Sequence, residues 1–121
     1  MVWAAPGNGH NPKFIVNETD TDKKEAFMLE YINKTVRAIG DYPMNWDVIN
    51  EAVSMSTDPE SPIYPLKESP WSDIDDLICK AFKAARDASA PNQKLYYNDY
   101  NHASLLWDKS TRIYEMISLM K

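Results

Sequence analysis

The chain alternates between short apolar runs and longer segments in which apolar residues recur every three or four positions. Two runs, residues 46–49 and 95–99, are rich in β-branched and aromatic side chains and predict strands. A helical stripe precedes the first strand and ends at Gly40, with Pro43 barring further helix; its members are Leu29, Ile32, Val36 and Ile39. The hydrophobic pattern therefore predicts a helix followed by a buried strand.

Similar stripes follow both strands. The one between the strands consists of Ile74, Leu77, Ile78, Ala81, Ala85 and Ala88. Ser72 with Asp75 resembles a capping box and predicts that this helix begins there. A last helix is expected from about Ser104, with a core-facing stripe of Ile113, Met116, Ile117 and Met120.

The order of these elements predicts an α/β fold. Residues 1–4 are apolar and predict the end of a further strand, so strand and helix alternate three times. Such alternation favours parallel strands joined by right-handed crossovers. Residues 54–70 hold four prolines and predict a loop with stiff corners, of a length that is often functional.

Composition narrows the classes of function. The 121 residues suffice for one core, and the net charge of −5 argues against a polyanion such as nucleic acid as partner. No apolar run is long enough to span a membrane. The single cysteine, Cys79, cannot form an internal disulfide, and a small buried apolar role is expected for it. His10 and His102 show no metal-site spacing, so we expect neither metal nor cofactor.

The candidate chemistry lies where the first strand ends, in Asn50 and Glu51. A strand buried on both faces should stay apolar, so a carboxyl group at its end suggests a purpose. In a parallel α/β barrel this position is the carboxyl-terminal rim, where catalytic residues sit. The alternative is a strand that simply runs out into a polar loop.

Two heptapeptides decide between these alternatives. Residues 46–52 (W-D-V-I-N-E-A) differ only at Ile49 from the W-D-V-V-N-E-A strand of glycoside hydrolase family 10 xylanases, and residues 95–101 (L-Y-Y-N-D-Y-N) differ only at Tyr97 from that family's L-Y-I-N-D-Y-N. Residues 81–86 also look like the family's A-F-x-x-A-R helix, and residues 1–3 look like its L-V-W-H strand end. The chain thus resembles that family from residue 1 to about residue 105.

The resemblance implies a TIM (β/α)₈ barrel, of which residues 1–121 form part of the catalytic domain. A complete barrel takes about 250 residues, so about three β/α units are expected here. Glu51 matches the family's general acid/base and Asn50 the residue that contacts the sugar 2-hydroxyl. The matches to sugar-binding positions are Trp3 on the glycone side and, on the aglycone side, Tyr100 and Asn101. For Trp46, Asp47, Asn98 and Asp99, support of the rim is the expected role.

The implied activity is that of a secreted endo-1,4-β-xylanase, a retaining hydrolase acting on the polysaccharide xylan, with a monomeric parent. The family's nucleophile follows a later strand that has no match after Asn101, and Glu115 lies on an amphipathic helix. The chain also ends inside a predicted helix at Lys121. We therefore expect a truncated, inactive fragment that carries half of the catalytic pair and associates through its unpaired sheet edges.

Two departures keep alternatives open. Where the family has histidine and glutamine after the strand tryptophan, this chain has Ala4 and Pro6. These changes suit a non-catalytic relic or a carbohydrate-binding piece of the same barrel. A related barrel glycanase acting on another β-1,4-glycan is a further alternative.

Overall fold

A computed structural model describes residues 10–54, 66–103 and 108–120. Along the chain it contains α1 (Lys13–Val16), α2 (Thr21–Ile39), β1 (Asn45–Asn50), α3 (Leu77–Ala88), β2 (Lys94–Asn98) and α4 (Lys109–Leu119). The strand predicted at residues 1–4, with Trp3, Ala4 and Pro6, lies outside the described residues. The strand and helix order predicted from residue 20 onward is confirmed.

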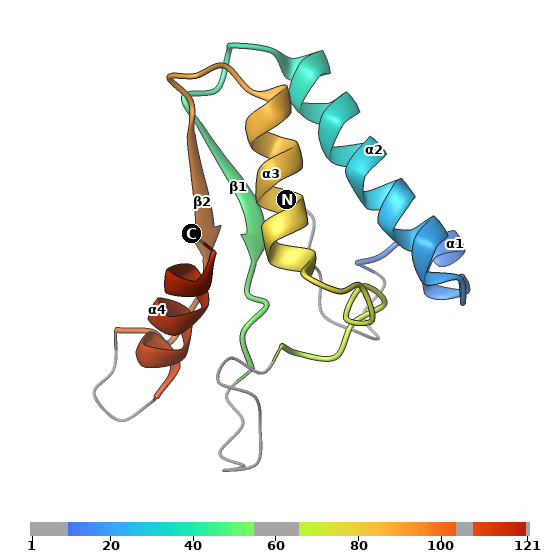
Figure 1. Ribbon diagram of the computed structural model, residues 1–121. Helices are drawn as coiled ribbons and strands as arrows, with labels where there is room; N and C mark the ends of the chain where they lie inside the picture. The colour runs from blue at the N-terminus through green and yellow to red at the C-terminus, as the bar shows by residue number, and fades with distance from the viewer. Residues whose placement is uncertain (1–9, 55–65, 104–107, 121) are drawn as a thin grey trace.

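The two strands form a parallel pair, as the alternation of elements predicted. Their register runs from Asn45 opposite Lys94 to Asn50 opposite Asn98, with one irregularity between Asp47 and Ile49. Both arrowheads in Figure 1 therefore point to the same end of the sheet. Because α3 connects the strands, the β1–α3–β2 segment is one crossover unit of an α/β fold.

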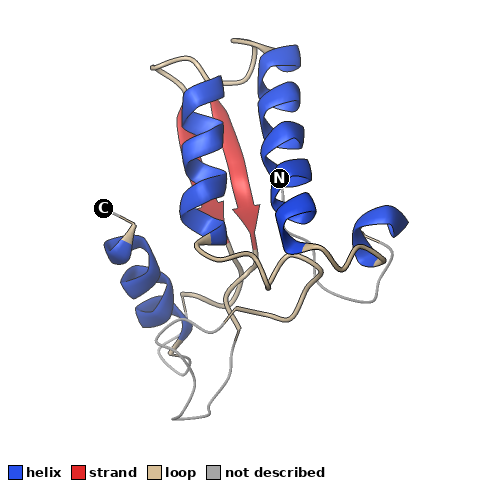
Figure 2. Cartoon of the chain, turned by 45° about the vertical axis from the view of Figure 1, so that its right-hand side comes forward, coloured by secondary structure: helices blue, strands red, loops and turns tan. Residues whose placement is uncertain are grey.

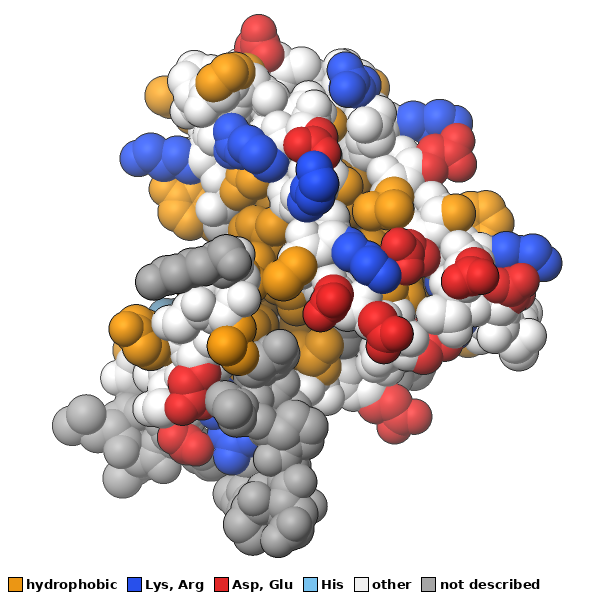
Figure 3. Space-filling view, viewed as in Figure 1, with side chains coloured by type: hydrophobic (Ala, Val, Ile, Leu, Met, Phe, Trp, Pro, Cys, Tyr) orange, Lys and Arg blue, Asp and Glu red, His pale blue; other side chains and the backbone are white. Residues whose placement is uncertain are grey.

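Helices α2 and α3 pack against each other, and α3 also contacts both strands (Figure 2). The core fills the space between helices and sheet and includes Met28, Ile32 and Val36 from α2, Leu77, Ile78, Ala81 and Ala85 from α3, and Val48 and Ile49 from β1. Acidic and basic side chains alternate over the outer face of the two helices (Figure 3), and Lys80 binds Glu25 across them at 2.7 Å.

Helix α2 ends at Gly40, as its sequence predicts, and it begins within residues 19–22, a run of Thr and Asp that offers several N-cap candidates. The Asp20 carboxylate accepts a hydrogen bond from the Lys23 backbone N–H at 3.2 Å, which is an N-cap interaction. At the other end Gly40 has φ 66° and ψ −142°, a conformation that is costly for any residue with a Cβ. Of the predicted stripe, Ile32 and Val36 are buried, whereas Ile39 in the last turn is exposed.

Two predictions about α3 are wrong. The helix begins at Leu77 and has no capping box, because the Ser72 hydroxyl bonds instead to the backbone of Ser69, accepting from its N–H and donating to its carbonyl. Residues before Leu77 form turns, although Ile74 is buried there as part of the core. Cys79 is exposed rather than buried, because the buried face of α3 passes through Ile78 and Ala81 and leaves position 79 toward solvent.

Helix α4 confirms its predicted stripe only in part. Met116 is buried and Ile113 and Met120 are partly buried, but Ile117 is half exposed. Its first residue, Lys109, is fully buried, which the hydrophobic pattern did not predict. No helix in residues 10–54, 66–103 and 108–120 has the length and apolarity needed to cross a membrane.

Candidate active site

The polar residues predicted from the two heptapeptides meet where β1 and β2 end side by side. Asn50 is the last residue of β1 and lies opposite Asn98, the last residue of β2. The Asn98 side chain donates a hydrogen bond from Nδ2 to Oδ1 of Asn50 at 2.6 Å. Next along the chain, the Glu51 backbone N–H donates to the Asn98 carbonyl at 2.7 Å. Parallel pairing thus brings Asn50 and Glu51 to the same rim as the segment that holds Tyr100 and Asn101.

The backbone at this rim is strained at two of the predicted site residues. Glu51 has φ 57° and Asn101 has φ 56°, both in the left-handed region that side chains with a Cβ rarely adopt. Strain of this kind costs about 1–3 kcal/mol and persists only where the surroundings hold it in place. Glu51 directly follows β1 and Asn101 lies three positions beyond the end of β2, and strained backbone of this kind clusters at functional sites.

Hydrogen bonds on both sides hold the turn that contains Glu51. On one side is the bond from Glu51 N–H to Asn98, and on the other the Val53 N–H donates to the Tyr97 hydroxyl at 2.9 Å. Beyond it, Val53 forms an antiparallel bridge with Leu66, and the Ala52 carbonyl accepts from the Lys67 N–H at 2.8 Å. The short segment 51–53 is therefore tied both to β2 and to the start of the segment after residue 65.

A buried ion pair lies behind the rim. Lys109 Nζ donates to Asp99 Oδ1 at 2.6 Å, and the two side chains are 0% and 1% exposed. The same carboxylate accepts the Tyr100 backbone N–H at 2.8 Å and the Tyr97 hydroxyl at 2.5 Å. Multiple hydrogen bonds of this kind are what a buried charge needs. Asp99 thus supports the rim, as expected, and Lys109 from α4 is its charged partner.

The Tyr100 ring lies close to two ammonium groups. Lys109 Nζ is 4.0 Å and Lys67 Nζ 4.6 Å from the ring centroid, both within cation–π range. Lys67 Nζ also lies 3.4 Å from the Tyr100 hydroxyl. Since the ring remains 43% exposed, it offers an aromatic surface whose position is fixed from behind.

Tyr97 is the titratable group at the rim whose environment changes it most clearly. Burial raises the pKa of its hydroxyl far above the usual value, and the hydrogen bond to Asp99 raises it further. The hydroxyl therefore stays protonated and donates to Asp99, while its oxygen accepts the Val53 N–H.

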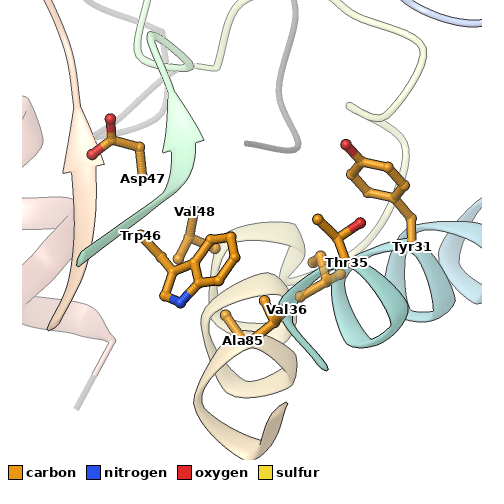
Figure 4. A pocket seen from close by; sticks show the side chains of 8 residues that line it. Tyr31, Thr35, Val36, Trp46, Asp47, Val48 and Ala85 are labelled. Atoms are coloured by element: carbon orange, nitrogen blue, oxygen red, sulfur yellow. The ribbon is translucent and has the colours of Figure 1, made fainter. Parts of the chain in front are cut away.

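Trp46 and Asp47 lie away from this rim, toward the start of β1. The Trp46 indole packs on the helix side of β1 and lines a small hollow with Tyr31, Thr35, Val36, Val48 and Ala85, whereas Asp47 points to the other side (Figure 4). Support of the rim, the role expected for Trp46 and Asp47, is therefore wrong for both, and Trp46 serves packing between β1 and the helices instead. Its buried Nε1 has no hydrogen-bond partner among the described residues.

Sequence reasoning missed Tyr97, Lys109 and Lys67. A signal for Lys109 was present, because it precedes Ile113, Met116 and Met120 by 4, 7 and 11 positions and so shares their helix face. No comparable signal marked Lys67, whose contact with Tyr100 spans 33 positions. Within the described ranges, no three His, Cys, Asp or Glu side chains are grouped so that they could hold a metal ion.

Comparisons with known proteins show which family the chain resembles. Glycosyl hydrolase family 10 matches the chain over residues 1–121. Endo-1,4-beta-xylanase A of Thermotoga maritima is 46% identical over 108 residues, covering 84% of this chain and 9% of the relative. The thermostable celloxylanase of Thermoclostridium stercorarium is 36% identical over 98 residues, covering 74% of this chain and 24% of the relative.

Solved structures show the same likeness. The crystal structure of native xylanase 10B from Thermotoga maritima superposes with a TM-score of 0.79 at 30% identity, covering 93% of this chain and 33% of that one. Endo-1,4-beta-xylanase XylE of Penicillium canescens gives 0.79 at 29% identity, with the same coverage. The chain thus spans about a third or less of the relatives it matches. It belongs to glycosyl hydrolase family 10, and its helices and parallel strands are a part of that family's TIM barrel.

Proposed function

We propose that this chain supplies the general acid/base side of a retaining endo-1,4-β-xylanase. The complete domain, meaning residues 1–121 together with the rest of their barrel, is the unit that would act. The observation that carries the proposal is the position of Glu51, held in left-handed backbone beside the paired Asn50 and Asn98 at the carboxyl ends of two parallel strands. Catalytic residues of TIM barrels come from this end.

Glu51 would act twice in each reaction cycle. Its carboxyl proton first passes to the oxygen of the leaving sugar as the glycosidic bond breaks, and a second carboxylate about 5–5.5 Å away takes the sugar as a covalent intermediate. Glu51 then removes a proton from the water that releases the sugar. We place the second carboxylate on a strand beyond residues 1–121, so these residues by themselves should be inactive.

Asn50 would hold the 2-hydroxyl of the sugar that reacts. Its Oδ1 already accepts a hydrogen bond from Asn98, so its own amide N–H groups remain to donate. Hydrogen bonds to the 2-hydroxyl strengthen as oxocarbenium character develops in the transition state, which lowers the barrier.

Sugars on either side would be held by the other predicted residues. The partly exposed ring of Tyr100 suits the face of a pyranose on the aglycone side, and Asn101, which follows it, supplies amide donors and acceptors there. Trp3 would line the glycone side, on the basis of the motif alone, since it lies outside the described residues.

Xylan is the proposed substrate, and several named relatives support this choice. They include the Thermotoga endo-1,4-beta-xylanases and a Thermotoga petrophila xylanase 10B solved in complex with xylobiose. We further propose that the parent protein is secreted, because its polysaccharide substrate is met outside the cell. We also propose that it is monomeric, as the family resemblance implies. A second β-1,4-glycan is the alternative that one observation favours, since a relative is named a celloxylanase.

The test measures reducing-sugar release by the complete domain and by its Glu51→Ala variant. Release from xylan but not from cellulose, lost in the variant, is the expected result. Equal release from cellulose would favour the broader glycanase. Binding of xylan without hydrolysis would favour the non-catalytic relic and contradict the proposal.

A further inference from the structure

Tyr97 is the one position at which the second heptapeptide departs from the family sequence, where isoleucine stands. An isoleucine side chain makes no hydrogen bonds. In this chain the Tyr97 hydroxyl makes two, both at the rim: it donates to Asp99 Oδ2 at 2.5 Å and accepts from Val53 N–H at 2.9 Å. The departure therefore adds a connection between the end of β2 and the turn that carries Glu51.

The far end of this connection is the buried ion pair. Lys109 Nζ binds Asp99 Oδ1, and the other carboxylate oxygen receives the Tyr97 hydroxyl. A carboxylate only accepts hydrogen bonds, and Asp99 Oδ2 is the oxygen that faces the Tyr97 hydroxyl. The Tyr97 proton must then point at Asp99, which leaves the Tyr97 oxygen to accept from Val53.

The near end lies two residues beyond Glu51. Glu51 adopts φ 57°, a conformation that persists only where the surroundings hold it. Its own N–H is held by Asn98, and the chain after it is held to β2 through Val53 and Tyr97 and to the segment after residue 65 through Leu66 and Lys67. Removing the Tyr97 hydroxyl would remove the tie through Val53 to β2 and leave the other ties in place.

We propose that Tyr97, oriented by the Lys109–Asp99 pair, is a positioning residue for the general acid Glu51. This inference rests on the proposed function of Glu51. The hydroxyl acts through the backbone of residues 51–53 and does not touch the substrate. A charged pair between α4 and the residue after β2 thereby fixes the direction in which a carboxyl group on the turn after β1 delivers its proton.

The experiment compares two substrates that differ in their need for an acid. The first, phenyl β-xylobioside, has a leaving group that must be protonated as the bond breaks. The second, 2,4-dinitrophenyl β-xylobioside, releases 2,4-dinitrophenolate, which leaves without a proton. The complete domain and its Tyr97→Phe variant are assayed on both for kcat/KM, with Tyr114→Phe, on the exposed face of α4, as the matched control.

We expect Tyr97→Phe to lower kcat/KM for the phenyl substrate about threefold to tenfold, the range of one net hydrogen bond. The dinitrophenyl substrate and the Tyr114→Phe control should be unaffected. A purely structural effect would lower kcat/KM for both substrates together. Equal losses of kcat/KM on the two substrates, or no loss on either, would therefore overturn the inference. Hydrogen exchange of the Val53 amide should also quicken in Tyr97→Phe, and unchanged exchange would contradict the connection.

Lys109→Met is an independent variant, and it too should lower kcat/KM for the phenyl substrate and not for the dinitrophenyl substrate. Its control is Lys80→Met, which removes a lysine of an ion pair between α2 and α3. If Lys109→Met does not fold, the Tyr97→Phe result decides. If the unmodified complete domain hydrolyses neither substrate, the proposed function fails, a result distinct from an active enzyme whose variants show no selectivity.

Discussion

Asn98 Nδ2 lies 2.6 Å from Asn50 Oδ1 and joins the last residues of two parallel strands. The two residues are 48 positions apart in the chain, and each comes from a different heptapeptide. Their bond fixes the Asn50 amide with its oxygen turned to Asn98 and its N–H groups available. The rim of this barrel segment thus prepares a hydrogen-bond donor next to the carboxylic acid Glu51.

Asn50→Ala should lower kcat/KM of the complete domain on xylan by about a hundredfold, because the 2-hydroxyl contact is strongest in the transition state. The control is Asn45→Ala at the opposite end of the same strand, where the side chain is exposed. The measurement is reducing-sugar release. Equal losses in both variants would mean that Asn50 acts through the strand and not through the sugar.

Lys109→Met should destabilise the complete domain by about 3–5 kcal/mol, because it leaves the Asp99 carboxylate buried and unpaired. Lys80→Met removes one member of a partly exposed pair and should destabilise the domain far less. Urea unfolding measures both free energies. The double variant Asp99→Asn with Lys109→Met should recover much of the loss, since no buried charge remains; a further loss would contradict this account.

Acid should weaken the link between α2 and the turns before α3. The Asp73 carboxylate accepts hydrogen bonds from Lys24 Nζ at 2.8 Å and from the Thr21 hydroxyl at 3.1 Å. The Lys24 bond is the largest cause that holds the pKa of Asp73 below its usual 3.8. A carboxyl group whose pKa is lower in the folded than in the unfolded state stabilises the fold at pH values above its unfolded-state pKa. That stabilisation is lost as the pH falls through its folded-state pKa.

The midpoint of thermal unfolding should therefore differ between wild type and Asp73→Asn at pH 6. The difference should shrink as the pH falls below about 4, where the Asp73 carboxylate becomes protonated. A difference that stays constant across this range would show that Asp73 contributes through packing and not through its charge.

Gly40→Ala should destabilise the complete domain by about 1–3 kcal/mol through the backbone alone. Gly40 has φ 66° and ψ −142°, and a Cβ built on it meets no atom within 4 Å. Steric conflict with neighbours is thus excluded as a cause. Chemical denaturation gives the value, and a neutral result would mean that the α2–β1 connection relaxes to another conformation.

The sequence predicted those parts of the fold that local pattern determines. Asp20 and Gly40 bound α2 because capping and positive φ depend on a single residue type. Asn50 and Glu51 were predicted at the strand end because the polar residues interrupt an apolar run. The α3 start was misplaced, because Ser72 found a nearer partner in the backbone of Ser69.

Contacts between distant segments were beyond local pattern. The burial of Lys109 depends on Asp99, which is ten positions earlier, just after the end of β2. The approach of Tyr97 to Val53 depends on the register of β1 against β2, which only the folded pair defines. Cys79 was misassigned for a different reason, since its burial was expected from its residue type, whereas the predicted stripe through Ile78 and Ala81 already left position 79 off the buried face of α3.

The central claim is that Glu51 donates the proton to the leaving sugar. Its most direct test is kcat/KM on xylan for the complete domain carrying Glu51→Gln, which keeps the size of the side chain and removes its acidity. The account predicts a loss of at least about a hundredfold, the lower end for a general acid. It also predicts no change for Glu30→Gln, whose carboxylate pairs with Lys34 on the exposed face of α2. Full activity of Glu51→Gln would contradict the assignment.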